Sequence, residues 1–260
     1  MWKNINFGNC LSYISSFADS EAYVDRNDAS KAAEDIYSAS EGRIHPSARP
    51  SITISRMCGA GGRTVASELV EYLQPHTPAG RRWAIFDKNL IEKVLEDHHL
   101  SKRIAEFLPE DHKSRFAEMI EKMKGLHPPT ATLVKQTAET IWNLAANGYV
   151  ILVGRAANVI TEKLDNVYHV RLVGSLASRI AQVEEVYELS RTDARDFVKS
   201  QDAAKRHYMK EYFGREIDDP MLYHIVINTD KISYRNAMRL IGDAVIHRFQ
   251  TAATAGTAAG

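Results

Sequence analysis

The chain has 260 residues, 44% of them hydrophobic and 25% charged, which is the balance of a globular protein with one large domain or two small ones. The formal net charge is zero, so broad electrostatic capture of nucleic acid or of an acidic membrane surface is not indicated. Two cysteines imply no disulfide framework, and no apolar run is long enough to cross a bilayer. The polar N-terminus does not resemble a signal peptide, which makes a cytoplasmic location the default expectation.

The first fifty residues form a stretch of their own. Helical fragments lead into a polar linker of small residues over 38–50. We expect residues 1–50 to be an N-terminal extension that docks on the main domain or pairs with another subunit. Association into a homo-oligomer therefore stays open.

A glycine-rich loop is the most informative local pattern. A β-branched run over 52–55 leads into Gly59-Ala-Gly-Gly-Arg-Thr64, and a helical pattern follows over 65–73. Strand, glycine loop and helix form an arrangement that binds phosphate, because bare glycines let backbone N–H groups converge on an anion at the positive end of the helix dipole. Cys58 in this loop is either an activated thiol or a small filler residue.

The loop lacks the lysine of the Walker motif G-x-x-x-x-G-K-[ST], and it can be aligned with that motif in two ways. In one alignment Arg56 occupies the first glycine position and Gly62 the lysine position. In the other, Gly62-Arg-Thr64 mimics Gly-Lys-Thr and Met57 replaces the first glycine. Either way an arginine must supply the positive charge, and arginine can grip phosphate bidentately. Arg63 is the first choice; the alternative is a turn that binds nothing.

Four further apolar runs alternate with helical segments. They cover residues 83–86, 149–153, 167–173 and 223–227. Such alternation predicts a parallel sheet with helices on both faces. Ligands of open α/β sheets bind at the carboxyl ends of the strands. The candidate site residues that directly follow these runs are Asp87, Arg155 and Asn228.

Two long helical inserts interrupt the alternation. The first covers 90–126 and leads into a helix over 130–146. The second runs over 190–213 and opens with a capping box, Ser190-Arg-Thr-Asp193. Asp202 and Arg206 stand four residues apart on it, which suits either a surface ion pair or a lid over a site. The last ten residues, 251–260, are of low complexity and are predicted to be disordered.

Four segments, taken in order, resemble the cytidylate kinase-like proteins, which are bacterial members of the P-loop nucleoside-monophosphate kinase superfamily. They are residues 54–63, 86–91, 151–158 and 219–230, and the resemblance covers about 51–249. It implies an α/β, three-layer αβα P-loop NTPase fold with a five-stranded parallel sheet of order 2-3-1-4-5. The kinase-like domain would cover 51–250, with an acceptor-binding insert at about 90–147 and a lid at about 190–215.

The resemblance also implies ATP- and Mg2+-dependent phosphoryl transfer to a nucleoside monophosphate, such as CMP or dCMP, or to a similar small metabolite. The glycine loop would hold the donor phosphates, and residues 228–230 would lie near the donor base. Arg63, Arg155 and Arg206 are expected to be catalytic, and Thr64 and Asp87 to bind the metal. The full expected nucleotide site comprises Ser55, Arg56, Gly59, Ala60, Gly61, Gly62, Arg63, Thr64, Asp87, Arg155, Arg179, Asp202, Lys205, Arg206, Asn228 and Thr229.

The chain departs from the true cytidylate kinases at three positions. Those enzymes have the P-loop lysine, an aspartate at the end of the third strand, and a second aspartate just after the arginine that Arg155 matches. Here the corresponding residues are Gly62 (or Arg63), Val153 and Ala156. Two alternative functions therefore stand beside the nucleotide kinase: a catalytically weak nucleotide-binding regulatory module, and a kinase for another metabolite that the insert before Tyr149 would select.

Overall fold

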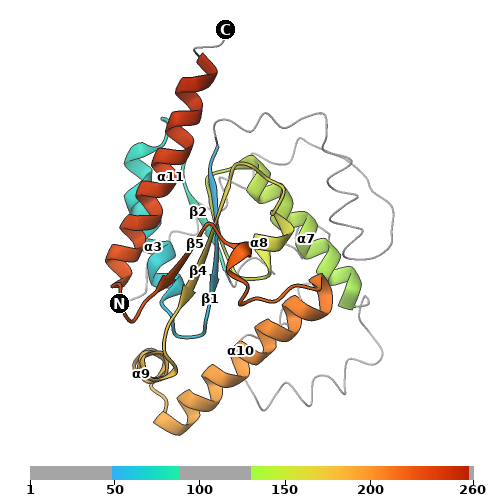
Figure 1. Cartoon of the computed structure of the whole chain (residues 1–260), viewed down its shortest axis with the longest axis vertical. Coiled ribbons are helices and arrows are strands. Elements are labelled where there is room, and N and C mark those ends of the chain that lie inside the picture. The colour runs from blue at the N-terminus through green and yellow to red at the C-terminus, as the bar shows by residue number, and fades with distance from the viewer. Residues whose placement is uncertain (1–48, 88–129, 258–260) are drawn as a thin grey trace.

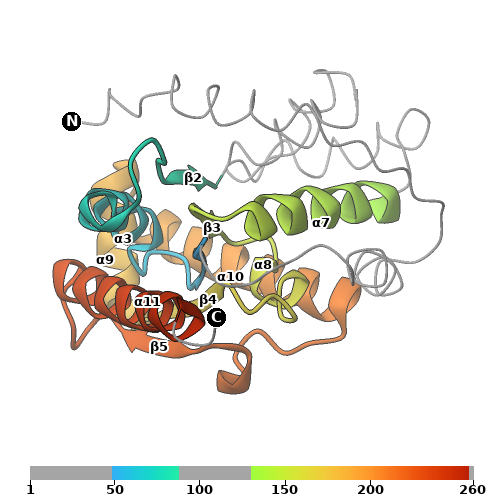
Figure 2. The ribbon, with the colours of Figure 1, turned by 90° about the horizontal axis from the view of Figure 1, so that it is seen from above.

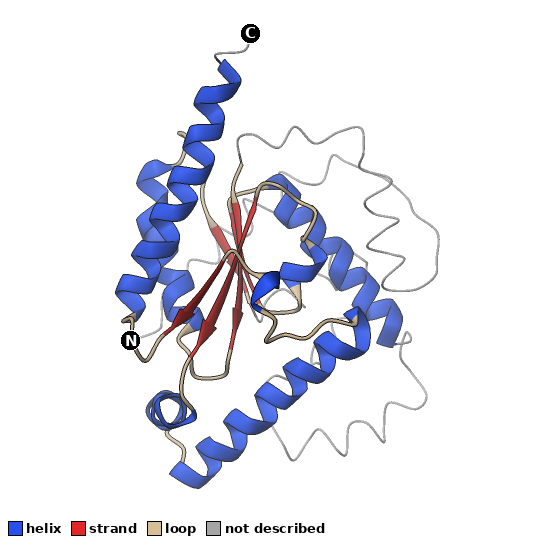
Figure 3. Cartoon of the chain, in the orientation of Figure 1, coloured by secondary structure: helices blue, strands red, loops and turns tan. Residues whose placement is uncertain are grey.

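A computed structural model describes residues 49–87 and 130–257 of the chain. These residues form a five-stranded sheet in which every neighbouring pair of strands is parallel, with helices on both faces (Figures 1 and 3). The strand order is β2-β3-β1-β4-β5, which confirms the predicted order. The strands are β1 (Ser51–Arg56), β2 (Ala84–Phe86), β3 (Val150–Val153), β4 (Val167–Val173) and β5 (Ile225–Asn228).

The helices form two layers around the sheet. Viewed from above, α3 and α11 cover one face, and α7, α8 and α10 lie on the other (Figure 2). The α-helices are α3 (Gly62–Leu73), α7 (Thr130–Asn147), α8 (Ala157–Ile160), α9 (Leu176–Tyr187), α10 (Arg191–Phe213) and α11 (Tyr234–Thr257). The part of the chain that the structure describes also contains the short 3-10 helices η1 (Gln74–His76) and η3 (Pro220–Leu222).

The two faces of the sheet differ because successive side chains of a strand point in opposite directions. Ile52 and Ile54 are fully buried and belong to the core under α3 and α11. On α3, Val65 and Leu69 stand four residues apart and pack into the same core. This packing fixes α3 behind the central strand, and its N-terminus therefore lies at the carboxyl end of β1.

The opposite face carries a buried polar strip between β1 and β4. The Oγ1 of Thr53 lies 2.9 Å from the Nδ1 of His169, and the backbone N–H of His169 donates to the Nδ1 of His224 at 2.9 Å. Burial, together with the nearby His224 and Arg248, lowers the pKa of His169 to about 3. His169 is therefore neutral at physiological pH.

The burial of His169 predicts a stability that depends on pH. The unfolded chain takes up a proton at this residue near pH 6.5, whereas the folded protein does so only near pH 3, so acid favours unfolding between these values. We expect the free energy of unfolding to fall by about 2 kcal/mol between pH 7 and pH 5, measured by urea unfolding. His169→Asn should remove most of this dependence, and an undiminished pH effect in that variant would contradict the assignment.

The structure bears differently on the predicted extension, insert, helix cap and C-terminal tail. Residues 1–48 of the predicted extension over 1–50, and the predicted insert over 90–126, lie outside the described residues. Ser190 caps α10 as predicted, with its Oγ accepting the N–H of Asp193. Composition predicts disorder over 251–260, and α11 extends into this tail as far as Thr257. Within the described residues, no helix combines the length and apolarity that a membrane span requires.

Candidate phosphate-binding site

The glycine loop joins the end of β1 to the start of α3. Gly59 and Gly61 have φ angles of 80° and 78°, in the left-handed region that favours glycine. A Cβ on Gly59 would lie 2.4 Å from the carbonyl oxygen of Arg179, and one on Gly61 would lie 2.3 Å from the ring of Tyr234. The first N–H groups of α3 have no acceptor within the helix, so this loop can present them to an anion.

Three charged side chains gather beside the loop. Asp87, which directly follows β2, accepts hydrogen bonds from Arg56 Nη2 at 3.2 Å and from Arg63 Nε. Asp87 is buried and the side chain of Arg56 is 17% exposed, whereas that of Arg63 is 46% exposed. The sheet order explains the meeting: the carboxyl ends of parallel strands lie at one edge. Two arginines bind one carboxylate, so the three side chains together have an excess of positive charge beside the loop.

The end of β3 carries unusual backbone conformations. Gly154, Arg155 and Ala156 have φ angles of 86°, 55° and 56°, so three successive residues are left-handed. Side chains make this conformation costly, and such strain clusters at functional sites. Arg155 lies near Tyr208 of α10. Burial raises the pKa of Tyr208 to about 12, and the positive charge of Arg155 acts against that rise.

The predicted lid is fastened to the loop through one buried carboxylate. Asp202 of α10 accepts the backbone N–H of Cys58 at 2.7 Å and Nη1 of Arg179 at 2.6 Å, and Lys205 Nζ lies 3.7 Å away. The same Nη1 of Arg179 also donates to the Cys58 carbonyl at 3.0 Å. Arg179, Asp202 and Lys205 are thus brought together. Asp202 pairs with these residues and not with Arg206, which is exposed; the surface-pair interpretation is therefore corrected.

Cys58 is a filler residue in this structure. Its side chain packs against a small apolar cluster of α9 and α10 that includes Ile180 and Val198. Burial raises the pKa of the Cys58 thiol, which is the opposite of what an activated nucleophile needs. The thiol thus helps to seat the two helices against the loop.

Other predicted residues are placed around the same edge of the sheet. Thr229 Oγ1 donates to the carbonyl of Val173 at 3.0 Å, and Asn228 ends β5 with an exposed side chain. Ser55 accepts a hydrogen bond at 2.8 Å from Arg171, which also binds Asp218 at 2.5 Å. Residues 59–64 form the loop itself, in which Thr64 is half-buried.

Sequence reasoning missed two groups in contact with the site. Arg171 is buried in β4 behind Ser55, and Tyr223 donates to the same Ser55 Oγ at 3.3 Å. Tyr234, the first residue of α11, covers Gly61 and has its hydroxyl 3.5 Å from the carbonyl oxygen of Gly59. The only signal for the first group was the arginine within a mostly apolar strand. Tyr234 had none.

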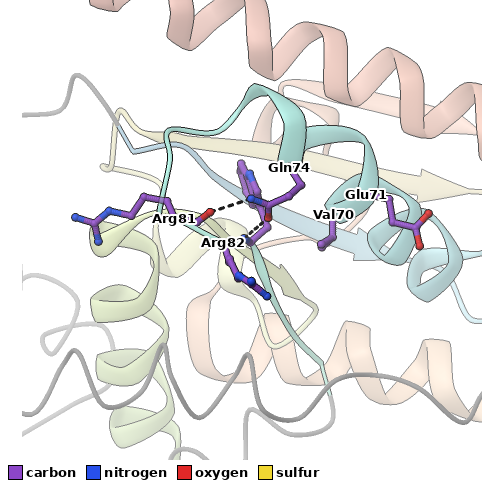
Figure 4. Close-up of a pocket in the computed structure, with 7 residues that line it drawn as sticks. Val70, Glu71, Gln74, Arg81 and Arg82 are labelled. Carbon is purple, nitrogen blue, oxygen red and sulfur yellow. Dashed lines mark hydrogen bonds between the residues drawn. The ribbon is translucent and has the colours of Figure 1, made fainter.

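A pocket of about 570 Å³ lies at a different place, between the C-terminal half of α3 and the segment that leads into β2 (Figure 4). Gln74 fastens this segment: its side chain donates to the carbonyl of Arg81 at 2.8 Å and accepts the N–H of Trp83 at 3.3 Å. The pocket adjoins the amino end of β2, whereas Asp87 follows the carboxyl end. Its lining residues are Val70, Glu71, Gln74, Gly80, Arg81, Arg82 and Trp83.

The sheet order and the glycine loop at the end of the central strand define a P-loop kinase fold. The model of the cytidylate kinase-like family matches residues 51–231, and the chain belongs to that family. The resemblance drawn from the sequence is therefore confirmed, and the chain is kinase-like with a nucleotide-binding P-loop fold. No curated protein matches the chain.

Solved structures give likenesses at low sequence identity. An uncharacterized protein from Eubacterium ventriosum ATCC 27560 is 20% identical, with 76% of this chain and 98% of that chain covered and a TM-score of 0.56. A shikimate kinase from Bacteroides thetaiotaomicron is 13% identical, covering 78% and 98%, with a TM-score of 0.40. A gluconokinase from Sinorhizobium meliloti 1021 is 10% identical, covering 84% and 100%, with a TM-score of 0.42. The first likeness shows a shared fold alone, and the other two are too weak to bear on the site.

Proposed function

We propose that this protein transfers the terminal phosphoryl group of ATP to a nucleoside monophosphate, with CMP or dCMP as the first acceptors to consider, or to a similar small metabolite. The observation that carries the proposal is the pair of arginines held on Asp87 beside the glycine loop. Phosphoryl transfer asks mainly for positioning and for positive charge around the transferring group. The family match and the P-loop kinase fold support the same class of reaction.

Each part of the site has a role in this proposal. The backbone N–H groups of residues 59–64 bind the donor phosphates, and Arg56 and Arg63 neutralise their charge. Arg155 reaches the acceptor phosphate from the end of β3. The acceptor phosphate is itself a nucleophile near neutral pH, so the reaction needs no strong base. Asn228 and Thr229 lie toward the donor base.

Magnesium fits this site as a partner of ATP. Within residues 49–87 and 130–257, no group of three or more His, Cys, Asp or Glu side chains could hold a metal ion. Mg2+ commonly binds through substrate phosphates and few protein ligands. Thr64 in the first turn of α3 and the carboxylate of Asp87 would supply such ligands, the latter through water because both oxygens already accept from arginines. The ion would neutralise phosphate charge during transfer.

A second candidate function rests on residue losses in the same site. Gly62 at the lysine position and Val153 at the end of β3 remove a cation and a carboxylate that support catalysis in true cytidylate kinases. A nucleotide-binding module with weak catalysis, used for regulation, would tolerate both losses. This candidate differs from the kinase in one observable: it binds ATP without acceptor-dependent turnover.

Release of ADP from Mg-ATP by the purified protein separates the two functions. CMP, dCMP, UMP, AMP and GMP are offered in turn, and ATP affinity is measured in parallel by calorimetry. ADP release that depends on an acceptor supports the kinase and names its substrate. Bound ATP without release supports the module. A protein that binds no ATP contradicts both functions.

The same assay tests the role of Arg63. We expect Arg63→Ala to lower transfer by about a hundredfold, because it removes one charged donor at the phosphates. Arg239→Ala is the matched control, since Arg239 is exposed on α11. Equal turnover in the two variants, with both still folded by circular dichroism, would remove Arg63 from the mechanism.

A further inference from the structure

The space that a P-loop lysine would need is already filled. Gly62 is the first residue of α3 and is buried. A Cβ on Gly62 would lie 2.8 Å from the Cγ of Arg56 and 3.3 Å from its Cβ and Cδ. These atoms form the stem of the arginine, which cannot turn aside without withdrawing the guanidinium from Asp87. A side chain at position 62 and the observed Arg56 therefore exclude each other.

A second glycine makes room for the charged end of Arg56. A Cβ on Gly154 would lie 2.1 Å from Nη1 and 3.1 Å from Cζ of Arg56. The arginine thus leaves the end of β1, passes the first residue of α3 and ends against the end of β3, where Asp87 accepts its Nη2. Two glycines leave room for the arginine side chain, and one carboxylate binds its guanidinium. Arg63 has no comparable enclosure, since its side chain is 46% exposed.

We propose that Arg56 performs the task of the missing P-loop lysine, and that positions 56 and 62 are an exchanged pair. The Walker loop has glycine at its first position and lysine at its seventh; here arginine occupies the first and glycine the seventh. The positive charge of Arg56 thus reaches the space of the missing lysine side chain from position 56 instead of from position 62. This inference rests on the proposed function, and it selects the alignment with Arg56 at the first glycine position over the one centred on Arg63.

Exchanging the pair back tests the inference. Four proteins are compared: wild type, Arg56→Gly, Gly62→Lys, and the double variant that restores the Walker residues. Affinity for inorganic tripolyphosphate and for Mg-ATP is measured by calorimetry, and the melting temperature by calorimetric scan. We expect each single variant to weaken tripolyphosphate binding at least about tenfold, and the double variant to return to within about threefold of wild type. Gly62→Lys alone should also melt lower, because its side chain collides with Arg56.

Two further variants keep the test decisive. Arg81→Gly is the matched control for Arg56→Gly, because Arg81 is exposed near the amino end of β2. Gly62→Ala serves if Gly62→Lys does not fold: it should weaken binding when Arg56 is present and be harmless when position 56 is glycine. Effects at positions 56 and 62 that simply add, or tripolyphosphate binding by Arg56→Gly as tight as wild type, would overturn the inference.

Failure of the inference is distinguishable from failure of the proposed function. Tripolyphosphate binding that depends on Arg56, without ADP release for any acceptor, leaves the inference standing and rejects the kinase. Acceptor-dependent ADP release at the wild-type rate in Arg56→Gly rejects the inference and leaves the kinase function standing. A wild-type protein that binds no tripolyphosphate overturns the inference directly.

Discussion

Asp87→Asn is expected to lower acceptor-dependent phosphoryl transfer by about a thousandfold while ATP binding stays equal or becomes tighter. One carboxylate holds both Arg56 and Arg63, so its loss releases two cations from their common position. Transfer suffers because misplaced charge no longer matches the transition state. Binding does not suffer, because the carboxylate competes with phosphate for the same guanidinium groups and asparagine carries no charge.

Steady-state ADP release and calorimetric ATP affinity, measured on the same preparation, separate the two effects. Asp165→Asn is the matched control, since Asp165 is exposed just before β4 at the far end of the sheet. A variant in which transfer and affinity fall together would mean that Asp87 acts in donor binding. Unchanged transfer would show that the arginines keep their positions without it.

The layered architecture could be predicted from the sequence, and the details of the site only in part. The strand at 167–173 is a short apolar run, and α3 follows the glycine loop at once, so local patterns locate these elements. Strand order came from the resemblance, because periodicity does not say which strands pair. The gathering of Arg56, Arg63 and Asp87 then follows from the rule that places ligand-binding residues at the carboxyl edge of the sheet.

Contacts between distant segments could not be predicted in this way. The sequence left two alignments of the glycine loop open, and what separates them is steric: the stem of Arg56 fills the space above Gly62. Asp202 and Arg206 have the spacing of a helical surface pair, yet Asp202 is buried and binds Arg179, which lies 23 residues earlier in the chain. Helical periodicity predicts which residues are neighbours on one helix, but it does not predict their contacts with a second helix.

The largest effect on stability is expected for Asp202→Ala. Arg179 is buried, and its charge would remain without the carboxylate that now lies 2.6 Å from Nη1. Removing one partner of a buried ion pair typically destabilises a protein by about 3 kcal/mol or more. We expect a loss of this size in urea unfolding. Asp196→Ala is the control: Asp196 lies on the same helix in an exposed pair with Arg195, whose loss should change stability by less than about 1 kcal/mol.

A local measurement shows whether this loss comes from the contact between α10 and the glycine loop. The N–H of Cys58 donates to Asp202, so its hydrogen exchange should accelerate strongly in Asp202→Ala and stay unchanged in Asp196→Ala. Exchange at Cys58 that is equally slow in both variants would mean that the loop keeps its shape without the contact to α10. Accelerated exchange would mean that α10 controls an N–H group of the phosphate-binding loop, because the carboxylate that seats the helix is the acceptor of that group.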